Sequence, residues 1–353
     1  MSLDPLIVDA VERFLAEQCP SERVRQIEQG GSPDALWSEL AELGLPDLLL
    51  PEEKGGAAAS MQTAARVFDA CGAAALPVPL AFTAWLRGLL YRAGIELPPG
   101  PVTLAKMSGE AGAPRCQRVP FAATARWVLA WGDDGARLLP VAQAEVIGST
   151  SGNANTLRRD LAWPDPSAAI ALDMSRDWQA DGALATAAML AGAARRCLEI
   201  TVDYANTRAQ FGRPIGKFQA IQHQLSVVAE EVFAMRMAAQ QAFAGYDHGA
   251  SASPGIHAEE THANRDAQLR VAMAKGRASE AARTVAALCH GIVGAIGITD
   301  EFALHLFTRR LLEWRQDFGG ETPWYERVGQ ALLAGGETPP SALDFLLAHQ
   351  PAA

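Results

Sequence analysis

The chain has 353 residues, of which 49% are hydrophobic and 20% are charged, so its composition is globular and excludes an acidic disordered chain. Its 30 basic and 40 acidic residues give a formal net charge of −10, and no dense basic segment occurs, which argues against nucleic acid as a partner. At roughly 150 residues per domain, this length predicts two or three domains.

Three features of the sequence indicate the cellular compartment of the protein. The stretches 182–194 and 284–299 are shorter than the roughly 20 residues that cross a bilayer, so we expect no membrane span. No basic region precedes the first apolar residues, unlike in a signal peptide. The five cysteines are far apart and match no disulfide framework. We therefore expect a cytoplasmic protein with reduced, packed cysteines.

Residues 1–96 predict an N-terminal helical domain. The apolar residues of a first helix recur every three or four positions, which places them on one face. They are Leu3, Leu6, Ile7, Ala10, Val11 and Phe14. Ser32-Pro33-Asp34 predicts the start of a helix that ends at Gly44. Its apolar residues are Leu36, Leu40 and Leu43. Two further helices are expected at about 60–72 and 80–93.

Residues 97–176 change to short apolar runs broken by glycine, proline and aspartate, which predicts a reduced middle β domain. Residues 127–131, the turn 132–135 and residues 136–141 indicate a hairpin. Because the segment is short, we expect only a few strands there.

Residues 177–353 predict a C-terminal helical bundle, so the fold class is mainly α with a small β domain. The first helix is expected at 182–206, and residues 247–264 are expected to form a loop. Two heptad-like seams are typical of antiparallel bundle helices. They are Ile221, Leu225, Val228, Val232, Met235, Ala239 and Ala242, and Val271, Ala274, Ala278, Ala281, Val285, Leu288 and Ile292.

The connection between the first two bundle helices carries the most informative residues. Glycines and a proline between 212 and 216 end one helix and begin the next. Arg208 could give bidentate hydrogen bonds to a phosphate or carboxylate, and Gln219 lies in a first helical turn, where the helix dipole favours anions. These residues alone leave two interpretations, an anion site and an ordinary surface or ion-paired Arg208.

Residues 207–223, TRAQFGRPIGKFQAIQH, resemble the TRxQFGxPIxxFQxxQH signature of the acyl-CoA dehydrogenases. LAELGL at 40–45 with PEEKGG at 51–56, and GAIGITDE at 294–301, are similar to two further patterns of that family. The resemblance implies an N-terminal helical domain, a middle β domain and a C-terminal four-helix bundle. It also implies an FAD-dependent oxidoreductase of lipid metabolism that carries out α,β-dehydrogenation of an acyl-CoA thioester.

The resemblance implies cofactor roles for seven residues. The family's arginine and glutamine, which bind the diphosphate and adenylate half of FAD across a subunit interface, correspond to Arg208 and Gln219. Gln210 and Phe211 belong to the same motif, and Phe211 is expected near the adenosine, with an anchor of the helix connection as the alternative. The family's QxxGG stretch falls on Gly291, Gly294 and Ala295, where Gly291 replaces the glutamine and Ala295 the second glycine.

The family's chemistry requires a carboxylate that removes the α-proton. One position of this base in the family falls on Phe318, which is not a carboxylate, and the other on Gly182, which is next to Asp181. Asp181 and Asp317 are therefore the candidate bases, with Glu321 as a weaker third.

Each candidate base has a structural alternative. Asp181 could cap a helix that starts near 182, and Asp317 could be paired with Arg315 or another surface group. The histidines at 248, 257 and 262 match no metal template, so we expect no metal site.

Two functional hypotheses follow from the resemblance. The first is an FAD-dependent acyl-CoA dehydrogenase that forms a homodimer or tetramer through its bundle. The second is a non-catalytic subunit that completes the FAD site of a larger paralogue, as in a heterotetramer. The first is the main hypothesis, and Arg208 and Gln219 are compatible with either. The missing carboxylate at the family's base positions favours the second, as does the absence of a TEPxAGSD-like loop and a WITN-like strand between residues 98 and 166. A purely structural bundle leaves Arg208 and Gln219 unexplained.

Overall fold

The computed structural model describes residues 4–108, 113–147, 157–249 and 262–333, which form two compact units. The first unit contains the described residues of Met1–Ser60 and Leu76–Gly182. The second contains those of Met61–Ala75, Ala183–Ser251 and Glu260–Ala353.

The helices of the first unit largely follow the sequence expectations. They are α1 (Asp4–Gln18), α2 (Ser21–Glu28), α3 (Asp34–Glu42) and α5 (Leu80–Arg92), with the 3-10 turns η1 (Leu45–Asp47) and η2 (Glu52–Lys54). The short α2 has no counterpart among the expectations. The predicted face of α1 is partly wrong, because Leu6 is 60% exposed and the buried residues are Val8, Val11 and Leu15. Two overlapping faces share the same helical spacing, and periodicity alone does not choose between them. Leu43, which directly follows α3, is likewise exposed.

The middle segment forms one seven-stranded sheet rather than the few strands expected. The strands are β1 (Val102–Ser108), β2 (Arg115–Val119), β3 (Trp127–Gly132), β4 (Gly135–Pro140), β5 (Glu145–Val146), β6 (Arg159–Ala162) and β7 (Ile170–Leu172). Their order is β5-β6-β2-β1-β3-β4-β7, and only β1 and β3 pair in parallel. The predicted hairpin is confirmed as β3 and β4, with Gly132 opposite Gly135. The expectation failed because β5, β6 and β7 have only two, four and three residues, so seven strands fit into the short segment.

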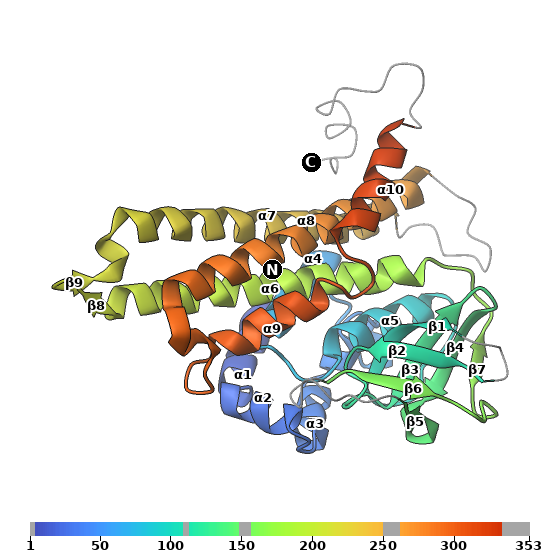
Figure 1. Ribbon diagram of the computed structural model, residues 1–353. Coiled ribbons are helices and arrows are strands. Elements are labelled where there is room, and N and C mark those ends of the chain that lie inside the picture. Colours follow the sequence, from blue (N-terminus) through green and yellow to red (C-terminus); the bar gives the residue numbers. More distant parts are fainter. Residues whose placement is uncertain (1–3, 109–112, 148–156, 250–261, 334–353) are drawn as a thin grey trace. The chain divides into compact units, whose positions relative to one another are not determined.

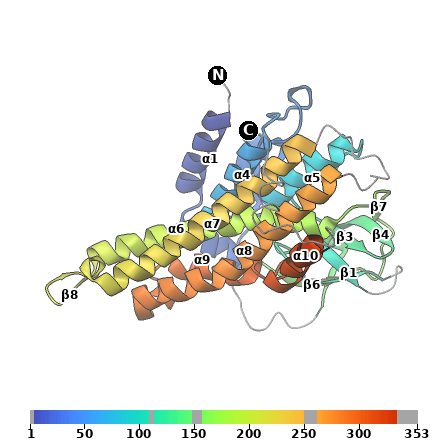
Figure 2. The same cartoon turned by 90° about the horizontal axis from the view of Figure 1, so that it is seen from above.

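The second unit contains the three long helices. They are α6 (Trp178–Thr207), whose first residues belong to the first unit, α7 (Gln219–Gly249) and α8 (His262–Val293). Figures 1 and 2 show the three helices running side by side. The shorter elements are α4 (Met61–Ala73), α9 (Leu304–Trp314), α10 (Glu321–Leu333), β8 (Ala209–Gln210), β9 (Arg213–Pro214), η4 (Ile215–Lys217) and η5 (Gly294–Ile298).

The two predicted seams are confirmed, because most of their residues are buried and none is exposed. The expected loop at 247–264 is shorter, since α7 reaches residue 249 and α8 begins at residue 262. Its remaining residues, with His257 among them, lie outside the described residues.

Helix α4 belongs to the bundle, although it is encoded in the N-terminal part of the chain. A Cβ atom on Gly72 would lie 1.9 Å from the carbonyl oxygen of Met189, and one on Gly192 would lie 1.7 Å from that of Asp69. Only glycines therefore permit this approach of α4 to α6. The carboxylate of Asp69 also accepts hydrogen bonds from Arg195 (3.0 Å) and Arg236 (3.1 Å), which joins α4 to α6 and α7.

Within the described residues, one stretch, Arg265–Ile298, is long and apolar enough to cross a membrane by length and composition. It includes most of α8, whose seam is buried in the bundle. The core helices of soluble proteins pass the same test, so the packing of α8 favours a core helix. The five cysteines are buried and free, as expected.

Candidate cofactor-binding end of the helical bundle

A tight hairpin, β8 and β9, connects α6 to α7. Gln210 pairs with Arg213, so the turn has two central residues, Phe211 and Gly212, with φ values of 51° and 79°. Positive φ at both positions is the geometry of a type I′ turn. A phenylalanine in this conformation is strained, and its side chain is 92% exposed. The hairpin thus presents an aromatic ring at its tip.

Arg208 and Gln219 flank this hairpin with exposed side chains. The backbone of Arg208 is fixed, because its N–H donates to Tyr204 (2.8 Å) and its carbonyl accepts from Ile215 (2.8 Å). Within the described part of the chain, its guanidinium has no hydrogen bond or ion pair. Gln219 is the first residue of α7, where the positive end of the helix dipole lies. A cation and an amide on a fixed backbone form a surface suited to an anion.

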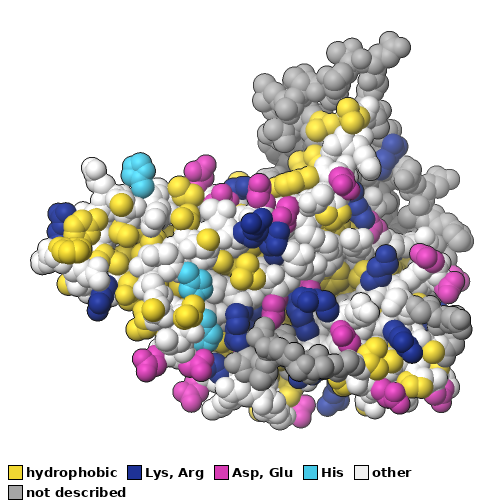
Figure 3. Space-filling view, viewed as in Figure 1, with side chains coloured by type: hydrophobic (Ala, Val, Ile, Leu, Met, Phe, Trp, Pro, Cys, Tyr) yellow, Lys and Arg dark blue, Asp and Glu magenta, His cyan; other side chains and the backbone are white. Residues whose placement is uncertain are grey.

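The second group of cofactor candidates lies at the same end of the bundle. Ile292 of α8 packs with Ala205 and Ile215 in one buried cluster. This cluster holds the end of α8 against the connection that bears Arg208. The neighbouring candidates Gly291, Gly294 and Ala295 are exposed. In Figure 3, hydrophobic and basic side chains gather at the β8–β9 end of the bundle. The structure therefore brings together the two segments that are predicted to bind the cofactor.

Asp181 lies in the first unit and is almost fully buried, at 1% exposure. Its two oxygens accept hydrogen bonds from the guanidinium of Arg176 at 2.6 and 2.8 Å, and one of them also accepts the indole N–H of Trp85 at 3.0 Å. The capping alternative is wrong, because Asp177 accepts the Ala180 N–H (3.0 Å) and caps α6. These contacts support a structural role for Asp181, and its role as a base stays a prediction.

Asp317 lies in the second unit, in the turn between α9 and α10, and is 7% exposed. The buried ammonium of Lys275 is a charged neighbour of its carboxylate. Arg315, the suggested partner of Asp317, forms an ion pair with Glu321. This hydrogen bond lowers the pKa of Glu321, which makes it a weaker base. The role of Asp317 as a base also stays a prediction.

The partners of Asp181 were missed from the sequence. Trp85 is 96 positions away in the chain, and no local pattern could reveal it. Arg176 precedes α6, so it has no helical spacing to Asp181 that would mark the pair. A charged pair five residues apart was the one visible signal.

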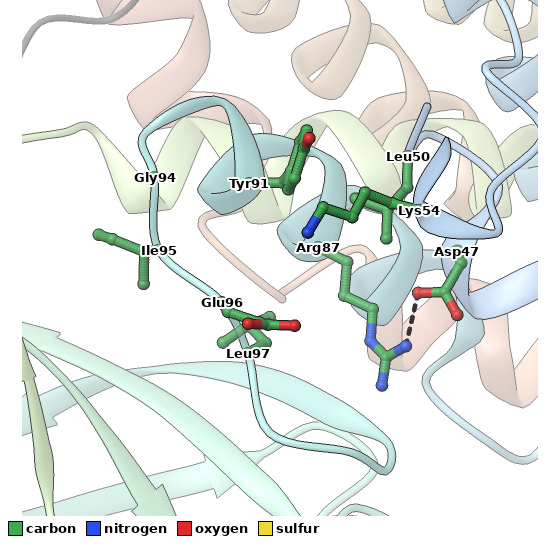
Figure 4. Close-up of a pocket in the computed structure, with 9 residues that line it drawn as sticks. All are labelled: Asp47, Leu50, Lys54, Arg87, Tyr91, Gly94, Ile95, Glu96 and Leu97. Carbon is green, nitrogen blue, oxygen red and sulfur yellow. Dashed lines mark hydrogen bonds and ion pairs between the residues drawn. The ribbon is translucent and has the colours of Figure 1, made fainter. Parts of the chain in front are cut away.

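The first unit also contains a pocket of about 390 Å³, shown in Figure 4. It is lined by Asp47, Leu50, Lys54, Arg87, Tyr91, Gly94, Ile95, Glu96 and Leu97. Arg87 is already paired with Asp47 at 2.6 Å, and the formal charges of Lys54 and Glu96 cancel. The pocket therefore selects no particular charge of ligand.

Comparison with known proteins agrees with the division into an N-terminal and a C-terminal helical part. Residues 4–96 match the acyl-CoA dehydrogenase N-terminal domain, and residues 180–315 match the acyl-CoA dehydrogenase C-terminal domain. The acyl-CoA dehydrogenase IpdE2 of Mycobacterium tuberculosis (strain ATCC 25618 / H37Rv) is 31% identical over 79% of this chain and 81% of its own length.

Two solved structures show the same fold at low sequence identity. One is the ChsE4–ChsE5 complex of Mycobacterium tuberculosis, with a TM-score of 0.76, 20% identity, and coverage of 96% of this chain and 99% of that chain. The other is a glutaryl-CoA dehydrogenase of Mycobacterium smegmatis in complex with FADH2, with a TM-score of 0.72, 16% identity, and coverage of 96% of both chains.

Proposed function

Because this chain belongs to the acyl-CoA dehydrogenase family, we propose that it is one subunit of a cytoplasmic, FAD-dependent enzyme that dehydrogenates an acyl-CoA thioester. In this proposal, Arg208 and Gln219 complete the FAD site of a second, larger chain, and that chain supplies the carboxylate that removes the α-proton. FAD held at this site would supply the acceptor for the hydride that leaves the β-carbon. The observation that carries the proposal is the contrast between exposed Arg208 and Gln219 and buried Asp181 and Asp317.

The side chains at the β8–β9 end fit the diphosphate and adenosine half of FAD. The guanidinium of Arg208 can pair with a phosphate through two hydrogen bonds. Gln219 adds an amide at the N-terminus of a long helix, where anions are favoured. Phe211 offers an exposed ring face to the adenosine. A Cβ atom on Gly291 or Gly294 would meet nothing within 4 Å, so the neighbouring surface is open.

The outward face of α7 supports assembly with another chain. Val227, Phe233 and Met237 are 41%, 62% and 55% exposed. Among the α7 residues whose exposure is described, Glu230 is the only exposed Asp, Glu, Lys or Arg. An apolar helix face of this kind is typical of an interface between subunits. The ChsE4–ChsE5 neighbour, which is a complex of two different chains, favours a heteromeric assembly here.

A self-sufficient homo-oligomeric enzyme is the second candidate. It is supported by the sheet, which has seven strands although the segment is short. In that case the base has to be Asp317 or Asp181, and the carboxylate has to exchange its present contacts for the substrate.

The test compares the chain expressed alone with the chain co-expressed with a larger paralogue. The measurements are the visible flavin spectrum and the mass in solution. We expect a colourless protein alone and a yellow complex after co-expression. A yellow oligomer with one FAD per chain, obtained alone, would favour the second candidate.

Variants of the complex test the role of Arg208. In Arg208→Ala the diphosphate loses its charged partner, so we expect less FAD per complex at unchanged mass. Arg213→Ala is the matched control, because Arg213 is an exposed arginine of the same hairpin whose guanidinium lies over the ring of Phe218 at 4.3 Å. Equal FAD content in both variants and the wild type would contradict the proposal.

A further inference from the structure

Lys275 of α8 is fully buried, and its ammonium group donates three hydrogen bonds. One goes to the hydroxyl of Ser279 on the same helix, at 2.7 Å. The other two go to the backbone carbonyls of Arg315 (2.9 Å) and Gly319 (2.7 Å). Both carbonyls belong to the turn between α9 and α10. A single side chain therefore holds the two ends of this turn.

The turn held by Lys275 has a strained backbone. Phe318 adopts a left-handed conformation with φ of 56°, which is unfavourable for a residue with a Cβ atom. Trp324 of α10 adds a second attachment, because its indole N–H donates to the carbonyls of Phe318 (3.1 Å) and Gly319 (3.2 Å). Strain of this kind persists only where the surrounding contacts determine the conformation. Lys275 and Trp324 supply these contacts.

The conformation decides which side chain the turn presents. Asp317 is 7% exposed and points into the protein, whereas Phe318 is partly exposed. If the two carbonyls were released, Phe318 could relax to a right-handed conformation, and the two side chains would change direction. The carboxylate is thus kept inward and the aromatic ring outward by the same contacts.

We propose that Lys275 is a positioning residue that fixes the α9–α10 turn and thereby keeps Phe318, rather than Asp317, at the surface. The inference goes beyond the proposed function, because it concerns the conformation of this chain with or without FAD. It also makes the turn sensitive to pH, since the buried amine of Lys275 binds a proton less readily than the same amine does in water once the turn is open.

The surroundings of Lys275 place this sensitivity near neutral pH. Burial lowers its pKa to about 7, opposed by the carboxylates of Asp317 and Glu321 and assisted by the guanidinium of Arg315. These charges come from the turn and the start of α10, and α8 contributes the neutral hydroxyl of Ser279. Opening of the turn would admit water to the amine and return its pKa towards the ordinary value of 10.5, so opening takes up a proton above about pH 7. We therefore expect the turn to open less often as the pH rises above 7.

The test is hydrogen exchange of the full chain at pH 6 and pH 8.5, read on the peptide that covers residues 315–321 and corrected for intrinsic exchange rates. After this correction, the wild type should exchange several-fold more slowly at pH 8.5 than at pH 6. Lys275→Met should exchange fast at both pH values. Trp324→Phe is the matched control, since it loosens the turn by removing an indole N–H and should retain the pH ratio of the wild type.

Two results would overturn the proposal. One is a Lys275→Met protein that folds and protects the peptide as the wild type does. The other is a wild-type protein whose corrected rates are equal at the two pH values. The second result needs no variant, so the proposal can be rejected even if Lys275→Met does not fold.

Discussion

The guanidinium of Arg176 and the carboxylate of Asp181 form a two-point ion pair inside the first unit, with N···O distances of 2.6 and 2.8 Å. Trp85 adds a third hydrogen bond, so α5 and the start of α6 are joined through one buried carboxylate. A catalytic base needs an oxygen that can reach a substrate proton. In Asp181 both oxygens are already engaged.

We expect Asp181→Asn to lower the free energy of unfolding by about 2 kcal/mol, because Arg176 would keep its charge without a buried partner. Chemical denaturation measures this change. Turnover of the assembled enzyme, per folded protein, should be retained. A folded Asp181→Asn protein that binds FAD normally but has lost turnover would instead identify Asp181 as the base.

Because α4 and α6 are in close contact at Gly72, we expect a substitution there to destabilise the protein. In Gly72→Ala the new methyl group would lie 1.9 Å from the carbonyl oxygen of Met189, so the helices must separate. We expect a loss of about 3 kcal/mol or more in the free energy of unfolding. Gly291→Ala is the control, because its methyl group meets nothing within 4 Å and helix propensity favours alanine. Similar denaturation curves for both variants would disprove this packing argument.

The resemblance to the family predicts that Gly291 stands in place of the glutamine of the QxxGG stretch, which contacts FAD in the family. The surface at this position has room for a side chain, since a Cβ atom meets no neighbour within 4 Å. We expect Gly291→Gln to slow the release of FAD from the complex a few-fold, because an amide regains a hydrogen bond to the cofactor. Dialysis followed by flavin absorbance measures the release. Gly291→Leu controls for size, and equal retention in the two variants would rule out the amide contact.

His290 should make the second unit sensitive to acid. Burial lowers its pKa below the ordinary value of 6.5, and the neighbouring His305 lowers it further. The unfolded chain then binds a proton that the folded chain does not, so the stabilisation is complete above about pH 6.5 and is lost as the pH falls through the folded pKa. We expect His290→Gln to show a smaller loss of unfolding free energy than the wild type between pH 7.5 and pH 5. Parallel losses in the two proteins would mean that other groups cause the acid sensitivity.

Local sequence patterns predicted the long elements well. The seams of α7 and α8 and the hairpin of β3 and β4 depend on residues that are close in the chain, so periodicity and turn chemistry indicate them directly. The same holds for the connection at 207–223, whose glycines and proline define the turn that follows Arg208. The edge strands β5 and β7 gave no such pattern because they have two and three residues.

The sequence by itself determined the helical, β and helical order and the family, and it predicted an anion site at one end of the bundle, since each depends on contiguous residues. Only the tertiary structure decided that α4 packs in the bundle, that Asp181 is paired with Arg176 and Trp85, and that Lys275 holds the turn at Phe318. Most of these contacts join residues that are far apart in the chain. Whether a carboxylate is available as a base depends on such partners, and a carboxylate in the sequence carries no sign of what its oxygens will meet.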